Sequence, residues 1–228
     1  MSSLSHPELR QRIVDAANRL VRTGVLSRSQ HGNISIRIPD TDQMLLTGAS
    51  TLAGVTLESL ARVSLAGEVL EGHLDPTSRE IIDMHGIVYK RRGDVGSVIH
   101  THSPFSTAYA VASKPIEITT ASIARLGVAQ PIPVSKFGPR GSELAVRYIE
   151  ETVDANPGCR ALLLENHGIL TFDSVIETAT QMVFALEETA EVSILASAIG
   201  EPKVIPPHLI VAAEQRRIEF ERLGTASA

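Results

Sequence analysis

The sequence is poor in several residue types, and each shortage excludes a class of protein. Its 228 residues include one cysteine, no tryptophan and only 4% aromatic residues. Because Cys159 has no second cysteine to pair with, an intrachain disulfide framework is excluded and a reducing compartment is favoured. Lysine and arginine (21) are outnumbered by aspartate and glutamate (26). With a net charge of −5, no basic excess indicates nucleic acid or an anionic membrane as a partner.

Long hydrophobic runs are also missing. No apolar segment approaches the roughly 18 residues that a membrane-spanning helix needs, and the polar residues 1–12 contain no apolar signal core. We therefore expect a cytoplasmic protein. The remaining composition, 43% hydrophobic and 21% charged residues, is that of an ordinary globular chain, and the length suits one domain over residues 1–228.

Hydrophobic periodicity predicts helices and short strands in alternation. Ser5 and Glu8 flank Pro7 as in a capping box, which predicts the start of an amphipathic helix that ends at Gly24. Further helices are expected over 78–92, from 103, and over 141–153, 173–197 and 207–223, with one helical turn over 56–60. Strands are expected over 33–38, 43–46, 63–65, 68–70, 95–101, 161–164 and 169–172. This order indicates a single α/β domain.

Histidines at the ends of predicted strands are the strongest chemical signal. His100 and His102 lie two residues apart on one strand, so their side chains point to the same face. Binding one divalent cation would relieve the cost of burying two unpaired imidazoles. A hydrogen-bonded structural role for one of them is the alternative. His167 follows another short strand and precedes a glycine; it is either a third ligand, as in catalytic zinc sites with an open position, or part of an ordinary turn.

Three other segments are candidates for substrate contacts. Glu80, at the start of a predicted helix, could carry a proton beside the metal, or could simply complement the helix dipole. The segments that contain Asn33 and the pair Thr47-Gly48 offer small side chains and amides that could form an anion-binding nest. Ordinary turns use the same residue types. Of the other histidines, we expect His85 in the core; His6, His31, His73 and His208 are expected in loops or at the surface.

Together and in this order, these segments resemble the class II aldolase/adducin superfamily. The resemblance covers about residues 9–195 and is carried by residues 32–35, Thr47-Gly48, Ser78 and Glu80, His100-Thr101-His102, 138–145 and Asn166-His167-Gly168. It implies a three-layer α/β/α fold with a mainly antiparallel central sheet. It also implies a homotetramer with active sites between subunits and a small-molecule substrate.

The resemblance further implies a role for each candidate residue. His100, His102 and His167 would bind one divalent metal ion per subunit, with zinc expected and manganese, iron or cobalt as alternatives. Glu80 would carry the proton. The substrate phosphate would be held by Asn33, Thr47, Gly48 and Ser78.

One motif departs from the family pattern. The usual Pro-Ser-Ser-Glu is replaced by Pro76-Thr77-Ser78-Arg79-Glu80, which shifts Glu80 by one residue. Arg79 takes the neighbourhood of a phosphate-binding serine, and its guanidinium could hold a phosphate or grip a carboxylate. The expected function is aldol cleavage of a small sugar-phosphate-like hydroxy-carbonyl through a metal-stabilised enediolate. Alternatives are a metal-dependent decarboxylase of a small hydroxy or oxo acid, which Arg79 favours, and a non-catalytic adducin-like binding domain.

Overall fold

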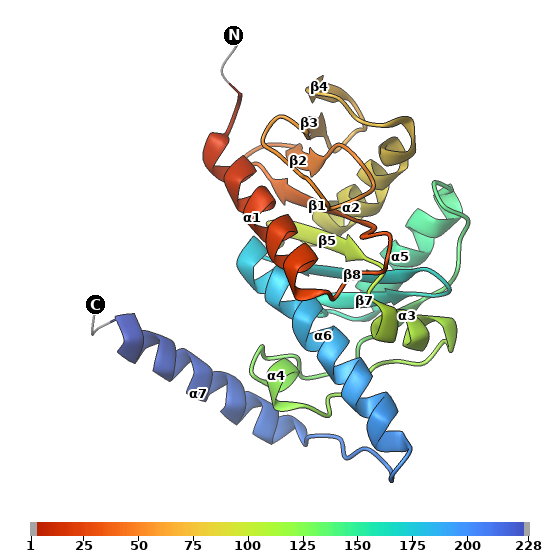
Figure 1. Cartoon of the computed structure of the whole chain (residues 1–228), viewed down its shortest axis with the longest axis vertical. Helices are drawn as coiled ribbons and strands as arrows, with labels where there is room; N and C mark the ends of the chain where they lie inside the picture. Colours follow the sequence, from red (N-terminus) through yellow and green to blue (C-terminus); the bar gives the residue numbers. More distant parts are fainter. Residues whose placement is uncertain (1–3, 226–228) are drawn as a thin grey trace.

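An eight-stranded sheet forms the centre of the molecule, in the order β4-β3-β2-β1-β5-β8-β7-β6 (Figure 1). The computed structural model describes residues 4–225. The strands are β1 Gly32–Arg37, β2 Gln43–Thr47, β3 Leu60–Ser64, β4 Val69–Glu71, β5 Ser97–Thr101, β6 Val134–Ser135, β7 Ala161–Leu164 and β8 Gly168–Asp173. The helices are α1 Pro7–Thr23, α2 Arg79–Arg91 after the 3₁₀ turn η1 Pro76–Ser78, α3 Pro104–Val111, α4 Ala121–Ala124, α5 Glu143–Ala155, α6 Ile176–Ser197 and α7 Pro207–Thr225.

The sheet is mixed, which corrects the expectation of a mainly antiparallel sheet. The pairings β1–β2, β1–β5, β2–β3, β3–β4, β5–β8 and β7–β8 are antiparallel, but β6 runs parallel to β7. A parallel pair needs a long crossover between its strands. Here that crossover is α5, which leads from β6 at the edge of the sheet to β7. The expected α/β class is seen.

Helices cover both faces of the sheet. Helices α1, α3 and α6 pack on one face, whereas α2 and α5 pack on the other (Figure 1). Successive side chains of a strand point to opposite faces of the sheet. Ile34 and Ile99 lie in the core beneath α1 and α6. Val98 and Leu170 lie in the core beneath α2 and α5. Side chains with the parity of Val98, including that of His100, therefore face α2 and α5.

Two local predictions are wrong. Ser5 does not cap α1; its backbone amide and hydroxyl instead bond the carboxylate of Glu71, far along the chain. The predicted helical turn over 56–60 is not formed; these residues form a loop that leads into β3, which begins at Leu60. The very short elements α4 and β6 were not predicted, since neither is long enough to show a period.

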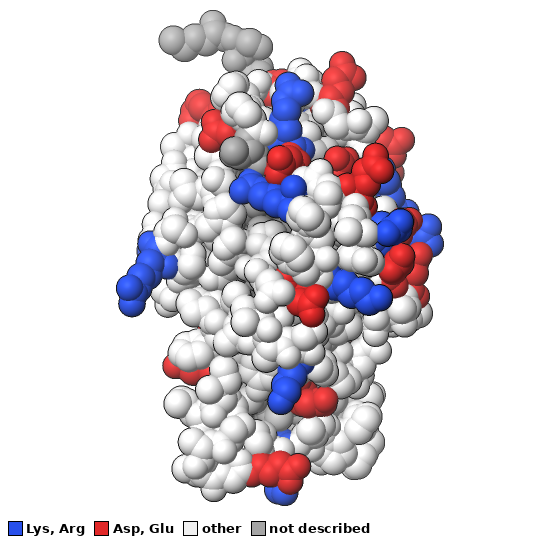
Figure 2. Space-filling view, turned by 90° about the vertical axis from the view of Figure 1, so that its right-hand side faces the viewer, with Lys and Arg blue, Asp and Glu red and all other residues white. Residues whose placement is uncertain are grey.

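The surface combines mixed charge (Figure 2) with one helix that exposes several large apolar side chains. Acidic and basic side chains are interspersed on the face that Figure 2 shows. Helix α7 projects from the body of the molecule beside α4 (Figure 1), and several of its large apolar side chains are exposed, namely Leu209, Val211, Phe220 and Leu223. Among residues 4–225, no helix combines the length and apolar character that crossing a membrane requires.

Candidate metal centre and substrate pocket

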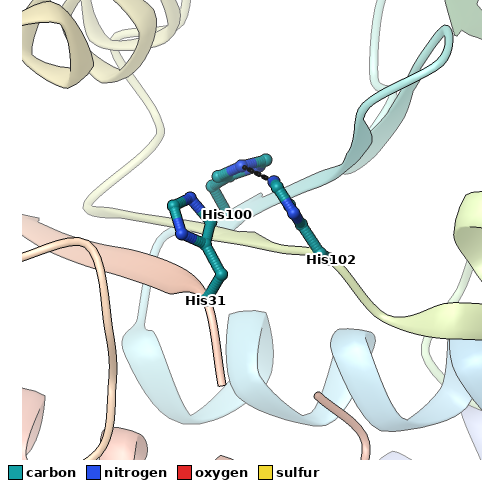
Figure 3. A group of neighbouring side chains, drawn as sticks. All are labelled: His31, His100 and His102. Carbon is teal, nitrogen blue, oxygen red and sulfur yellow. Dashed lines mark hydrogen bonds between the residues drawn. The ribbon is translucent and has the colours of Figure 1, made fainter. Parts of the chain in front are cut away.

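The pairing of β1 with β5 brings histidines from two segments together. Asn33 pairs with His100, and Gly32 pairs with Thr101. Continuing this register sets His31 opposite His102. Figure 3 shows the imidazoles of His31, His100 and His102 gathered at the ends of these strands.

The three predicted metal ligands lie close together, and a fourth histidine joins them. The ring centroid of His167 is 4.7 Å from that of His100 and 4.8 Å from that of His102. The ring of His31 lies 4.3 Å from that of His102 but 6.2 Å from that of His100. One ligand nitrogen from each of His31, His100 and His102 lies within 4.8 Å of the others, so a histidine triad is placed to bind an ion. His31 lies just before β1, outside the named strands, and is half-buried. Sequence reasoning missed that the strand register brings it into this cluster.

The turn before β8 presents His167 to the cluster. Asn166 has a positive φ of 56°, a conformation that asparagine tolerates better than most residues. Gly168 is packed so tightly that a Cβ atom there would lie 2.5 Å from the carbonyl oxygen of Thr101 and 3.0 Å from Cδ2 of His102. Asn166 and Gly168 therefore both suit the backbone that carries the histidine.

The imidazoles are suited to bind a cation because they are neutral. Burial lowers the pKa of His102 to about 3 and the pKa of His167 to about 4, and it holds the pKa of His100 well below its usual value. Nδ1 of His100 donates to the carbonyl oxygen of Ile169 at 2.8 Å, which leaves the lone pair of Nε2 for a ligand. That atom lies 3.1 Å from Nε2 of His102. Two nitrogens bound to one tetrahedral zinc ion are about 3.4 Å apart, so the donor set fits a divalent metal.

A pocket opens beside the histidines and contains Glu80. Its lining includes three of the clustered imidazoles, an amide, acidic side chains and basic side chains, among them His31, Asn33, Glu80, Asp83, His100, Lys136, Arg140, Glu165 and His167. Glu80 lies on the first turn of α2 and lines the pocket. Nε of Arg140 lies 3.3 Å from Oε2 of Glu80. Gly141 follows, with a φ of 74°, and a Cβ atom there would lie 2.5 Å from Cδ of Glu80.

The predicted substrate-binding residues separate into two groups. Asn33 is 1% exposed and lines the pocket; its Oδ1 accepts from Nε2 of His85 at 2.6 Å, while its Nδ2 has no partner among the described residues. The other four do not line this pocket. Arg79 is exposed and does not line this pocket, so its substrate contact stays a prediction.

Packing contacts account for Thr47 and Gly48, whereas the buried hydroxyl of Ser78 has no hydrogen-bond partner among the described residues. Oγ1 of Thr47 accepts from the backbone amide of Ile34 at 3.1 Å, and a Cβ on Gly48 would lie 2.5 Å from the carbonyl oxygen of Ser59. Ser78 is fully buried. Sequence reasoning missed Lys136 as a pocket residue, since the two-residue strand before it gives no periodic signal.

The comparisons with known proteins agree with this fold. The chain is 30% identical over 199 residues, covering 86% of this chain and 89% of its relative, to the 5-deoxy-D-ribulose 1-phosphate aldolase of Bacillus thuringiensis serovar kurstaki. It is 29% identical over 166 residues, covering 70% of this chain and 75% of its relative, to the 3-oxo-tetronate 4-phosphate decarboxylase of Haemophilus influenzae. The solved structure of an L-fuculose 1-phosphate aldolase superposes with a TM-score of 0.80 at 24% identity, covering 95% of this chain and 99% of the other.

An aldolase and a decarboxylase both cleave a carbon–carbon bond, so the two curated relatives are lyases. The model of the Class II Aldolase and Adducin N-terminal domain matches residues 11–194, a span that contains the histidine cluster and the pocket. This chain therefore belongs to the class II aldolase and adducin N-terminal domain family.

Proposed function

We propose that this protein is a divalent-metal-dependent lyase that performs the aldol cleavage of a small phosphorylated hydroxy-ketone. The observation that carries the proposal is a cluster of neutral imidazoles in a pocket that also holds an amide donor, Asn33, and a carboxylate, Glu80. The aldolase name of the Bacillus relative supports it. A phosphorylated substrate is supported by that name and by the hydrogen-bond donors that line the pocket.

We assign His100, His102 and His167 as the metal ligands, with zinc the expected ion and manganese, iron or cobalt as alternatives. His167 is preferred to His31 because the family resemblance assigns it and its ring lies within 4.8 Å of both other rings, whereas the ring of His31 is 6.2 Å from that of His100. The competing ligand set is His31, His100 and His102, whose nitrogens lie within 4.8 Å of one another. A bound cation would stabilise the negative charge that develops on the substrate oxygens during cleavage.

The protein groups around the ion have separate tasks in this proposal. Glu80 would take the proton of the substrate hydroxyl as the carbon–carbon bond breaks, and would return it to the carbon that keeps the bonding electrons. Arg140 would hold the Glu80 carboxylate in place through their ion pair. Asn33 would donate to a phosphoryl oxygen, since an unpaired buried donor is stabilised by an acceptor.

The direct test is a cleavage assay on metal-stripped and metal-refilled protein. Breaking the C3–C4 bond of 5-deoxyribulose 1-phosphate gives dihydroxyacetone phosphate and acetaldehyde, and both products should appear only after zinc is restored. His102→Ala should abolish the reaction, whereas the control His208→Ala changes an exposed histidine of α7 and should retain it. Full activity after chelation, or none with any metal, would contradict the proposal, and bound substrate without turnover would favour the non-catalytic alternative.

The ligand assignment needs its own experiment. His167→Ala should remove most of the bound metal, as measured by elemental analysis after dialysis, while His31→Ala should retain close to one ion per chain. The reverse result would exchange the two histidines in the ligand set. His208→Ala again serves as the matched control.

A decarboxylase is the second candidate, and a specific observation favours it. Lys136 and Arg140 line the pocket near the histidines, where a substrate carboxylate could pair with them. The Haemophilus relative is named as a decarboxylase. Release of carbon dioxide from 3-oxo-tetronate 4-phosphate, without any aldehyde product, would decide for this reaction.

We also propose the homotetramer that the family resemblance implies. Its support is the exposed apolar surface of α7, on which Phe220 and Leu223 are 58% and 62% exposed, because such patches mark interaction sites. Light scattering should give four times the chain mass of 24.5 kDa, and Phe220→Glu should produce smaller species. A single-chain mass for the unaltered protein would overturn the assembly. The cytoplasmic location stays a prediction.

A further inference from the structure

A row of four buried polar side chains connects the pocket to the interior. Asn33 and Ser35 share one face of β1, and His85 and Tyr89 lie one turn apart on the face of α2 that packs against it. All four are at most 1% exposed. Oγ of Ser35 lies 2.8 Å from the hydroxyl of Tyr89 and 2.7 Å from Nδ1 of His85, and Nε2 of His85 lies 2.6 Å from Oδ1 of Asn33.

The direction of each hydrogen bond in this row can be derived from its inner end. The Tyr89 hydroxyl is buried, and among the described residues its hydrogen-bond partner is Oγ of Ser35 at 2.8 Å, so the Tyr89 proton is donated to Ser35. Ser35 then donates its own proton to Nδ1 of His85. A neutral imidazole carries one proton, so the proton of His85 is on Nε2 and is donated to Asn33.

This order determines which end of the Asn33 amide faces the pocket. Oδ1 is occupied by His85, and Nδ2 is buried without a partner among the described residues. The opposite order would turn Oδ1 outward and leave the Tyr89 proton without an acceptor, which is costly in a buried site.

We propose that Tyr89, Ser35 and His85 are positioning residues that fix Asn33 as a hydrogen-bond donor, so that this wall of the pocket selects an acceptor-only group such as a phosphoryl or carboxylate oxygen. The proposal rests on the proposed function, because the ligand group is the anionic end of its substrate. It adds three residues that do not line the pocket and a reason why the amide has one orientation.

The first test is spectroscopic. In the zinc-loaded full chain labelled with ¹⁵N-histidine, the long-range ¹H–¹⁵N spectrum at pH 7 should show His85 as the Nε2–H tautomer. Tyr89→Phe removes the inner donor and should shift His85 toward a mixture of tautomers. An Nδ1–H tautomer in the unaltered protein, or no change in Tyr89→Phe, would overturn the proposal.

The second test is the affinity of the zinc-loaded protein for inorganic phosphate, measured by calorimetry. Asn33→Asp keeps the shape and removes the donor, and it should weaken binding about 10- to 100-fold. His85→Gln, whose amide can still donate to Asn33, should stay within about threefold of the unaltered protein, whereas His85→Leu should lose about tenfold or more. Equal losses in the glutamine and leucine variants would mean a packing role only and would overturn the proposal.

Controls separate this inference from general destabilisation and from the proposed function. Thr180→Val removes another buried hydroxyl, which bonds the carbonyl oxygen of Ile176 within α6 on the opposite side of the sheet, and phosphate affinity should not change. Each variant is compared by its thermal unfolding midpoint. Tautomer and phosphate affinity require no turnover, so a protein without aldolase activity can still satisfy both tests, and an active aldolase can still fail them.

Discussion

Lowering the pH should destabilise this protein through His85, and the size of the effect can be calculated. Full burial lowers the pKa of His85 to about 3 in the folded protein, against about 6.5 in the unfolded chain. The unfolded state therefore binds the additional proton first. The contribution of His85 to the free energy of unfolding is therefore fully present above pH 6.5, and it is lost as the pH falls toward 3.

Between pH 7 and pH 5 the loss from His85 alone is about 2 kcal/mol, because the unfolded imidazole becomes protonated while the folded one stays neutral. His85→Gln keeps a donor for Asn33 and removes the titrating ring. The difference in unfolding free energy between this variant and the unaltered protein should therefore shrink by about 2 kcal/mol over that interval.

Urea unfolding at both pH values, with EDTA present so that metal release adds no pH dependence, measures this difference. His208→Gln provides the control, since that histidine is exposed on α7 and its effect should be the same at both values. If the His85→Gln difference is constant within about 0.5 kcal/mol, the burial and neutrality assigned to His85 are refuted.

Three further predictions concern the site. Gly141→Ala should lower kcat at least about tenfold by displacing Glu80. Gly158 is the control, because it has a similar positive φ of 82° but open space for a Cβ. Gly158→Ala should change the free energy of unfolding by about 1 kcal/mol and leave kcat unaltered. Gly168→Ala should reduce bound metal in elemental analysis, because its Cβ meets the histidine cluster; Gly96→Ala, which collides with a carbonyl elsewhere, should retain it. EDTA should abolish cleavage, and added zinc should restore it; activity that survives complete metal removal would exclude a catalytic ion.

Local patterns predicted much of the fold. Isoleucines at alternate positions of β1 indicated one buried face, and the structure places Ile34 and Ile36 in the core beneath α1 and α6. The same rule put His100 and His102 on one face before any tertiary contact was known. The period of α2 also held, since Ile81, His85 and Tyr89 are all buried.

Contacts between distant segments could not be predicted, because they depend on strand pairing. His31 became a neighbour of His102 only through the register of β1 with β5. Ser5 satisfied the capping pattern but bonded Glu71 instead, since a tertiary partner replaced the local one. The contact of Glu80 with Arg140 in the pocket likewise joins segments far apart in the chain, which sequence spacing does not reveal.

The position of β6 has a consequence for how this enzyme family could diversify. The two-residue strand pairs on one side only, and the loop behind it supplies Lys136, Phe137 and Arg140 to the pocket wall. The clustered imidazoles lie at the ends of β5, in the β7–β8 turn and just before β1, in the middle of the sheet. Exchanges at Lys136 and Phe137 can therefore alter the pocket wall while the histidine cluster is kept, provided that Arg140 and Gly141, which contact Glu80, are retained.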